Sequence, residues 1–210
     1  MTDHSSPPVE ALVVVDVQSA FFTGDQAVPE AEQVLVGTGT MLERARESGA
    51  LVVHLQNDGA PGTSDEPGTP GWELHLPVRR GPGETVIRKA HDDGFRETAL
   101  GDVLTGAGVR SLAVCGVMSE MCVAATARQA LERGYRVVLP HDAHGTYDVP
   151  AAAGISDVVP AAVASRVAEW SLGDEVEIVA HADEVRFTAP PSAVRPPGPL
   201  DRAHRSAWPG

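Results

Sequence analysis

Lysine is nearly missing from this chain: of its 16 Lys and Arg residues, only Lys89 is a lysine. Arginine carries a planar cation of very high pKa, whereas lysine is a compact point charge whose protonation burial can tune. Because coding bias explains a surplus of arginine, the one remaining lysine is a candidate for chemistry that arginine cannot perform. The alternative is an incidental surface lysine. The residues that lie near Lys89 distinguish between these two interpretations.

Further absences narrow the class of protein. No apolar run reaches the roughly 18 residues of a membrane-spanning helix. The N-terminal sequence MTDHSSPPVE lacks the basic and apolar regions of a secretory signal, so we expect a cytoplasmic protein. The net charge of −13 argues against nucleic acid as a partner. That charge suits a cationic small substrate, or simply a well-solvated surface.

Cysteine is also scarce. The only two are Cys115 and Cys122, and neither their number nor their spacing indicates a disulfide framework or a metal cluster. Cysteine is most often a buried packing residue, and this reading suits Cys115, which lies within an apolar run. Cys122 stands in a different context and is considered below.

What the sequence does contain is an alternation of strand and helix patterns. Apolar, β-branched runs typical of parallel strands covered on both faces lie at 11–17, 50–55, 111–117 and 135–140, with edge strands at 85–88 and 175–180. Helical patterns lie at 30–48, 98–107, 121–133 and 160–171, and glycine follows the first three. This order predicts an α/β fold, a three-layer Rossmann-like sandwich whose mostly parallel sheet is covered by helices on both faces.

The domain boundaries follow from composition. We expect a single domain over residues 9–189, preceded by a disordered tail at 1–8 and followed by a disordered Pro-rich tail at 190–210. Inside the domain, the segment 57–82 is long and rich in Gly and Pro. Ordered loops of that length usually serve as lids or binding loops.

Three reactive side chains fall at or just beyond the carboxyl ends of predicted strands, where open α/β sheets bind ligands. They are Asp16, Lys89 and Cys122. A buried carboxylate in an apolar strand is costly unless it is paired or used, which favours a function for Asp16. With Ser119 as N-cap, Cys122 becomes the third helical residue, where the helix dipole should depress the thiol pKa. Together the three supply a base, a cation and a nucleophile.

The motifs around these residues resemble a known family, the isochorismatase-like cysteine hydrolases, which include nicotinamidases, carbamoylsarcosine amidases and streptothricin hydrolases. The resemblance covers about residues 9–188. It rests on VVVDVQSAFF, VIRKAHDDGF and CGVMSEMCVAATARQALERGYRVVLPHDAHGTYD. It implies that Asp16 is the general base, that Lys89 holds the Asp–Cys pair, and that Cys122 attacks a carbonyl to form an acyl-enzyme. The fixed charge and bulk of arginine would not suit position 89.

The resemblance implies two further features. A cis peptide should precede Met118, directing the backbone N–H groups of Met118 and Cys122 toward the substrate oxygen as an oxyanion hole. Family members are commonly dimers or tetramers, so we expect a homo-oligomer.

The family resemblance also bears on metals and substrate. The stretch VVHLQNDG lacks the Asp-x-His pair of zinc-dependent nicotinamidases, and the histidines at 141 and 144 lack carboxylate companions at useful spacing, so we expect no metal and no cofactor. Acidic residues around the predicted site favour a cationic amide. The segment PGTPGWELH and the Cys122 motif are similar to streptothricin hydrolases, which open a lactam. The residues that we expect to contact substrate are Gln18, Phe22, Trp72, Phe95 and Glu120, although Trp72 would equally suit a loop anchor.

The sequence therefore predicts a cysteine hydrolase of an amide or lactam C–N bond, in first place a streptothricin lactam. Another small-amide hydrolase, nicotinamidase-like or carbamoylsarcosine-amidase-like, is the alternative. Two alternatives on the same fold are not hydrolases. A redox sensor would need Cys115 within reach of Cys122. A non-catalytic protein would leave Asp16, Lys89 and Cys122 without a function.

Overall fold

The computed structural model of the chain describes residues 6–191. Seven strands form one sheet in which every strand pairing is parallel. The strand order is β3-β2-β1-β4-β5-β7, and the short β6 pairs with β4. The strands are β1 Ala11–Val15, β2 Leu51–Asn57, β3 Glu84–Lys89, β4 Ser111–Val117, β5 Arg136–Pro140, β6 His144–Gly145 and β7 Val176–Val179. The predicted three-layer α/β sandwich is confirmed, and β3 and β7 are its edges as expected.

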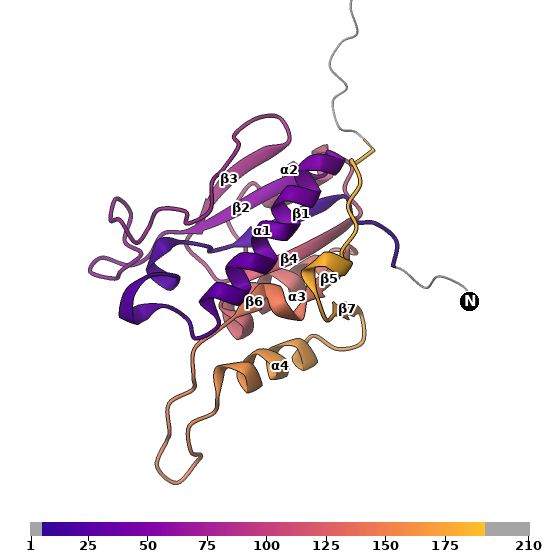
Figure 1. Cartoon of the computed structure of the whole chain (residues 1–210). Helices are drawn as coiled ribbons and strands as arrows, with labels where there is room; N and C mark the ends of the chain where they lie inside the picture. The colour runs from indigo at the N-terminus through magenta and orange to yellow at the C-terminus, as the bar shows by residue number, and fades with distance from the viewer. Residues whose placement is uncertain (1–5, 192–210) are drawn as a thin grey trace, which may run out of the picture.

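Helices cover both faces of the sheet (Figure 1). They are α1 Ala31–Ser48, α2 Leu100–Gly106, α3 Ala124–Glu132 and α4 Ala161–Ser171. Alternate residues of β1 enter two cores: Leu12 and Val14 pack on the α1 side, whereas Val13 and Val15 pack on the α2 and α3 side. This burial on both faces explains the continuous apolar sequence of the central strands.

Two predicted boundaries differ in an informative way. The strand expected at 11–17 ends at Val15, because Asp16 turns out of the strand with a φ of 50°. The helix expected at 121–133 is a regular α-helix only from Ala124, since residues Ser119–Val123 form a π-helical turn. Both departures occur where the predicted site residues lie.

Most of the two predicted tails lies outside the described residues. Within the described part, Arg136 donates hydrogen bonds to the carbonyls of Pro7 and Pro8 at 2.6 and 3.0 Å, so the end of the predicted N-terminal tail packs on the domain. No helix over residues 6–191 is both long and apolar enough to cross a membrane.

Candidate active site

Asp16, Lys89 and Cys122 meet at the carboxyl edge of the central strands. Lys89 Nζ lies 2.7 Å from Asp16 Oδ2 and donates a hydrogen bond to Cys122 Sγ at 3.2 Å. Lys89 and Asp16 are buried, whereas Cys122 is half-buried. Residues from three separate parts of the chain thus form a buried ion pair with a more accessible thiol beside it.

The local backbone explains how Asp16 reaches this position. Its φ of 50° lies in the left-handed region, which Asp tolerates better than most non-glycine residues. The neighbouring strand approaches closely at Gly116, which pairs with Val15 and has a φ of 115°. A Cβ on Gly116 would lie 1.9 Å from the carbonyl oxygen of Val15, so only glycine permits this close approach of β1 and β4.

The turn that carries Cys122 differs from the expected helix start. Met118, not Ser119, occupies the N-cap position, and no side chain caps the turn. Ser119 Oγ instead lies 2.8 Å from His144 Nδ1 and 3.0 Å from Ser165 Oγ. The expected capping by Ser119 is therefore wrong. The expected cis peptide is present between Val117 and Met118.

The electrostatics of the site place the proton on sulfur at rest. Burial raises the pKa of Asp16 to about 6 against the opposing effect of Lys89, so Asp16 is a carboxylate at neutral pH. Burial, together with the charge of Asp16, raises the pKa of the Cys122 thiol above its ordinary range, and Lys89 only partly offsets this. The expectation of a depressed thiol pKa is wrong, because a buried sulfur faces a carboxylate rather than the N-terminus of a regular helix.

Lys89 carries the positive charge that balances the Asp16 carboxylate. Burial alone would lower the pKa of Lys89, but the charge of Asp16, together with the interactions with Cys122, outweighs it and raises that pKa. Asp16 Oδ1 has no hydrogen-bond partner among the described residues and is buried. A carboxylate oxygen without a partner beside a protonated thiol can accept that proton.

Asp92, one of the acidic residues around the predicted site, is a direct neighbour of the thiol. The Cys122 thiol is within 3.6 Å of Asp92 Oδ1 and is oriented to donate to it. The sequence signal was present, since Asp92 lies three residues beyond Lys89 in the motif KAHDDGF. Asp92 also lines a cavity of about 380 Å³, together with Asp93, Glu120, Met121, Ala124, Ala125, Arg128, Gln129, Glu132 and Ser171.

The five residues expected to contact substrate do not line one cavity, although Gln18 donates a hydrogen bond to the Trp72 backbone oxygen at 3.0 Å. Phe22 lies in the core on the α1 side, where it stacks on His75, and Phe95 lies in the opposite core, where it stacks on Tyr135. Gln18 is fully buried, and its amide bonds to the backbone of Asn57. Only Glu120 is exposed at the cavity next to Cys122. The two phenylalanines are apolar enough to be drawn into the cores rather than left on a pocket wall.

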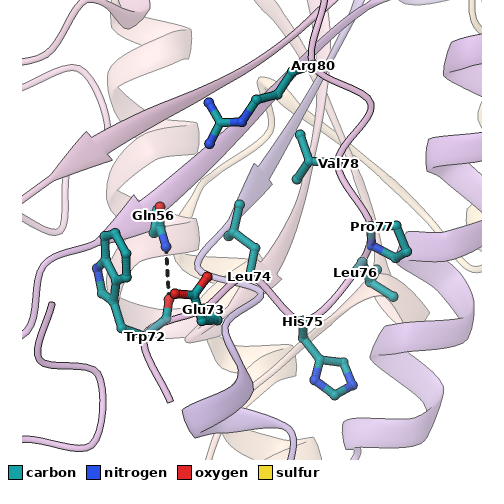
Figure 2. Close-up of a pocket in the computed structure, with 9 residues that line it drawn as sticks. All are labelled: Gln56, Trp72, Glu73, Leu74, His75, Leu76, Pro77, Val78 and Arg80. Atoms are coloured by element: carbon teal, nitrogen blue, oxygen red, sulfur yellow. Dashed lines mark hydrogen bonds between the residues drawn. The ribbon is translucent and has the colours of Figure 1, made fainter. Parts of the chain in front are cut away.

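Trp72 belongs to a second cavity, of about 350 Å³, formed by the end of β2 and the loop 72–80 (Figure 2). Its indole Nε1 donates to Asp58 at 3.0 Å, and the Arg88 guanidinium lies over its ring at 5.1 Å. Its backbone oxygen accepts hydrogen bonds from Gln18 and Gln56. These contacts fit the loop-anchor alternative for Trp72.

This fold and this cluster define a class of protein. Residues 10–165 match the family model described as the isochorismatase domain, and the chain belongs to that family. The resemblance drawn from the sequence motifs is thus confirmed.

Particular relatives narrow the comparison. The chain is 70% identical over 184 residues to a streptothricin hydrolase of Streptomyces noursei, a match that covers 88% of this chain and 73% of the relative. A crystal structure of an isochorismatase from Pseudomonas putida superposes with a TM-score of 0.76 at 29% identity, covering 86% of this chain and 93% of that one. The N-carbamoylsarcosine amidase of Thermoplasma acidophilum has a TM-score of 0.64 at 28% identity, covering 83% and 97%.

Proposed function

We propose that this chain is a streptothricin hydrolase, which opens the streptolidine lactam of that antibiotic by cleaving its C–N bond and so inactivates it. The observation that carries the chemistry is the contact of Lys89 Nζ with both Asp16 Oδ2, at 2.7 Å, and Cys122 Sγ, at 3.2 Å. The assignment of the substrate is supported by the 70% identity to a streptothricin hydrolase.

In the first half of the reaction, Cys122 forms a covalent bond to the substrate. As Sγ attacks the lactam carbonyl carbon, the thiol proton passes to the Asp16 carboxylate. The carbonyl π electrons move to oxygen, and the backbone N–H groups of Met118 and Cys122 stabilise that oxyanion. When the oxyanion collapses, the C–N bond breaks, and the nitrogen takes the proton from Asp16. The product of this half is a thioester with a free amine.

In the second half, water hydrolyses the thioester. Asp16, again a carboxylate, takes a proton from water as its oxygen attacks the acyl carbon. The C–S bond then breaks, and the thiol regains its proton from Asp16. Lys89 stays protonated throughout, because the negative charge beside it raises its pKa. Its role is to hold Asp16 and Cys122 in place and to balance the negative charge that moves between them.

The charge of the cavity beside Cys122 fits a cationic substrate. Four carboxylates, those of Asp92, Asp93, Glu120 and Glu132, line it with a single guanidinium, that of Arg128. Such a surface attracts a polycationic amide to the thiol through charge complementarity and repels an anionic one. The dianionic substrate of an isochorismatase would meet the wrong charge at this cavity.

The direct test is a substrate panel. Purified protein is incubated with streptothricin, nicotinamide and N-carbamoylsarcosine, and the products are analysed by mass spectrometry. We expect streptothricin alone to gain the mass of one water, with loss of its antibacterial activity. Turnover of nicotinamide or N-carbamoylsarcosine in place of streptothricin would move the assignment to another amidase of the family.

We also infer that the chain associates with a second copy of itself. Val163, Val167 and Trp170 lie along one face of α4, and each is about half or more exposed, with Trp170 at 76%. Exposed apolar residues in one row are typical of an interface. Light scattering should give a dimer or larger assembly, and Trp170→Glu should shift it toward the monomer. A wild-type monomer at all concentrations would refute the inference.

A further inference from the structure

A second group of polar side chains gathers away from Asp16, Lys89 and Cys122. His141 begins a 3-10 turn at the end of β5, His144 begins β6, and Glu169 lies in α4. His141 Nδ1 lies 2.5 Å from Glu169 Oε1, and His144 Nε2 lies 3.0 Å from the same oxygen. The possible ligand atoms of the three side chains all lie within 4.8 Å of one another.

Burial distinguishes this group from an ordinary surface cluster. The side chains of His144 and Glu169 are 0% and 1% exposed, whereas that of His141 is 43% exposed. One oxygen of this buried carboxyl group, Oε1, has two imidazole nitrogens directed at it.

We propose that His141, His144 and Glu169 form a binding site for a divalent transition-metal ion of the Zn²⁺ type. Two imidazole nitrogens and one carboxylate oxygen are ligands that Zn²⁺ binds at about 2.0–2.2 Å. A three-residue set leaves at least one position for water or another small ligand. The ion would replace the direct contacts of the two histidines with Glu169 Oε1, after a small outward shift of the side chains.

The surroundings of the three residues suit such a site. His144 Nδ1, the ring nitrogen remote from Glu169, lies 2.8 Å from Ser119 Oγ. A metal-bound histidine usually donates its other N–H to an oxygen, which sets its tautomer and ring orientation. Arg166 lies 3.2 Å from the second carboxylate oxygen, Oε2, so that Oε1 is the oxygen left for an ion.

An ion can also reach the site from solvent. An open cavity of about 360 Å³ is lined by His141 and Glu169 together with Arg166, Ile178, Val179 and Ala180. Across residues 6–191, no other three His, Cys, Asp or Glu side chains bring their ligand atoms this close together. The site is separate from the nucleophile, but Ser119 connects the two, since it begins the turn that carries Cys122.

The test measures metal binding directly. Untagged protein is treated with chelator, dialysed and titrated with ZnCl₂ by calorimetry, and Co²⁺ is titrated in parallel while its visible absorption is followed. We expect one ion per chain. Loss of an outer-shell partner alone weakens metal binding by about 10–100-fold, so removal of a ligand should weaken it by more than about 100-fold.

His141→Ala is the leading variant, because His141 is half-exposed and its loss should leave the fold intact. His181→Ala is the matched control: His181 Nδ1 also contacts a carboxylate, Asp142 Oδ2 at 3.1 Å, but belongs to no group of three ligands. We expect His141→Ala to lose binding and His181→Ala to retain it, with thermal melts confirming that both variants fold.

Glu169→Gln and Ser119→Ala complete the design. Glu169→Gln keeps the shape of the side chain and should lose the ion, whereas Ser119→Ala should bind it about 10–100-fold more weakly. If wild-type protein takes up no Zn²⁺ or Co²⁺ at about millimolar concentration, or if His141→Ala and Glu169→Gln bind as well as wild type, the group is a hydrogen-bonded cluster only. The readout is binding rather than turnover, so it does not depend on the proposed hydrolase activity.

Discussion

The ammonium group of Lys89 lies 2.7 Å from Asp16 Oδ2, and the two side chains are 0% and 3% exposed. A buried ion pair of this kind is sensitive to the loss or displacement of either partner. Here the lysine also reaches the sulfur of Cys122, so that one cation contacts both the proposed base and the proposed nucleophile.

Lys89→Arg should nearly abolish turnover while the protein remains folded. The planar guanidinium is larger than the ammonium and cannot occupy a fully buried position between a carboxylate and a sulfur without moving both. Loss of one preorganised electrostatic contact typically lowers kcat about 10²–10³-fold, and we expect at least that effect. Arg88→Lys, on the exposed side of the same strand, is the control and should stay active. Wild-type kcat in Lys89→Arg would mean that the lysine is incidental.

The rate should depend on pH through Asp16. Burial raises the pKa of Asp16 to about 6, and only its carboxylate form can take the thiol proton. As pH falls through 6, Asp16 becomes protonated, so kcat/KM should drop about tenfold for each further pH unit. Initial rates from pH 4.5 to 8 check this, provided that circular dichroism shows the fold to be intact. A flat profile down to pH 5 would exclude Asp16 as the base.

Cys122→Ala should remove activity, whereas Cys115→Ala should keep it. Cys122 packs at the core on the α2 and α3 side, and Cys115 is buried in the core on the α1 side. Burial raises the pKa of Cys115 to about 12, which leaves it inert. Because the two sulfurs belong to opposite faces of the sheet, peroxide should not join them. Peptide mapping that finds a Cys115–Cys122 disulfide in folded protein would favour the redox-sensor alternative.

Removing negative charge from the cavity beside Cys122 should weaken the binding of a cationic substrate. Glu120 and Glu132 are exposed there, so we expect Glu120→Gln with Glu132→Gln to raise KM about 2–5-fold with little change in kcat. Salt should reduce the difference, because exposed charges are screened. Glu43→Gln, on α1 at the opposite face, should leave KM unchanged. If Glu43→Gln raised KM as much as the paired Glu120→Gln and Glu132→Gln substitutions, the net charge of the protein, not the charge of the cavity, would control substrate binding.

Gly116→Ala should destabilise the fold strongly. The new Cβ would lie 1.9 Å from the Val15 oxygen at a φ of 115°, which an L residue rarely adopts. The conformation alone costs about 1–3 kcal/mol, and the clash adds to it, so the free energy of unfolding in urea should fall by about 3 kcal/mol or more. Gly106→Ala, in α2 with open space around it, should be neutral or slightly stabilising. Similar urea midpoints for Gly116→Ala and wild type would show that the two strands separate easily.

Most of the fold could be predicted from the sequence because the signals were local. The run in β1 is apolar at every position and that in β4 at every position after Ser111, and such runs are typical of a sheet that is covered on both faces. Gly49 ends α1 in the left-handed conformation, as its place after the helical pattern predicted. The π-helical turn at Ser119–Val123 could not be predicted, because its sequence SEMCV has no feature that separates it from the first turn of an ordinary helix.

The site was predicted in part. Asp16, Lys89 and Cys122 follow strands that end at one edge, so their meeting could be expected from topology. Phe22 and Phe95 end two of the site motifs, each six residues beyond Asp16 or Lys89, but a single sequence does not tell which face of the sheet receives each ring. The structure places them in opposite cores.

The sequence by itself determined the α/β sheet, the family and the three reactive residues, since strand patterning and motif order are properties of short segments. Only the tertiary structure decided which charges those residues carry and which side chains lie next to them. Burial beside a carboxylate, rather than position in a helix, raises the pKa of Cys122. Likewise Glu169 reaches His141 and His144 across 28 and 25 residues of chain, because α4 packs against β6 and the turn that carries Cys122. Protonation and side-chain convergence depend on what surrounds a group in space, and the order of residues does not record it.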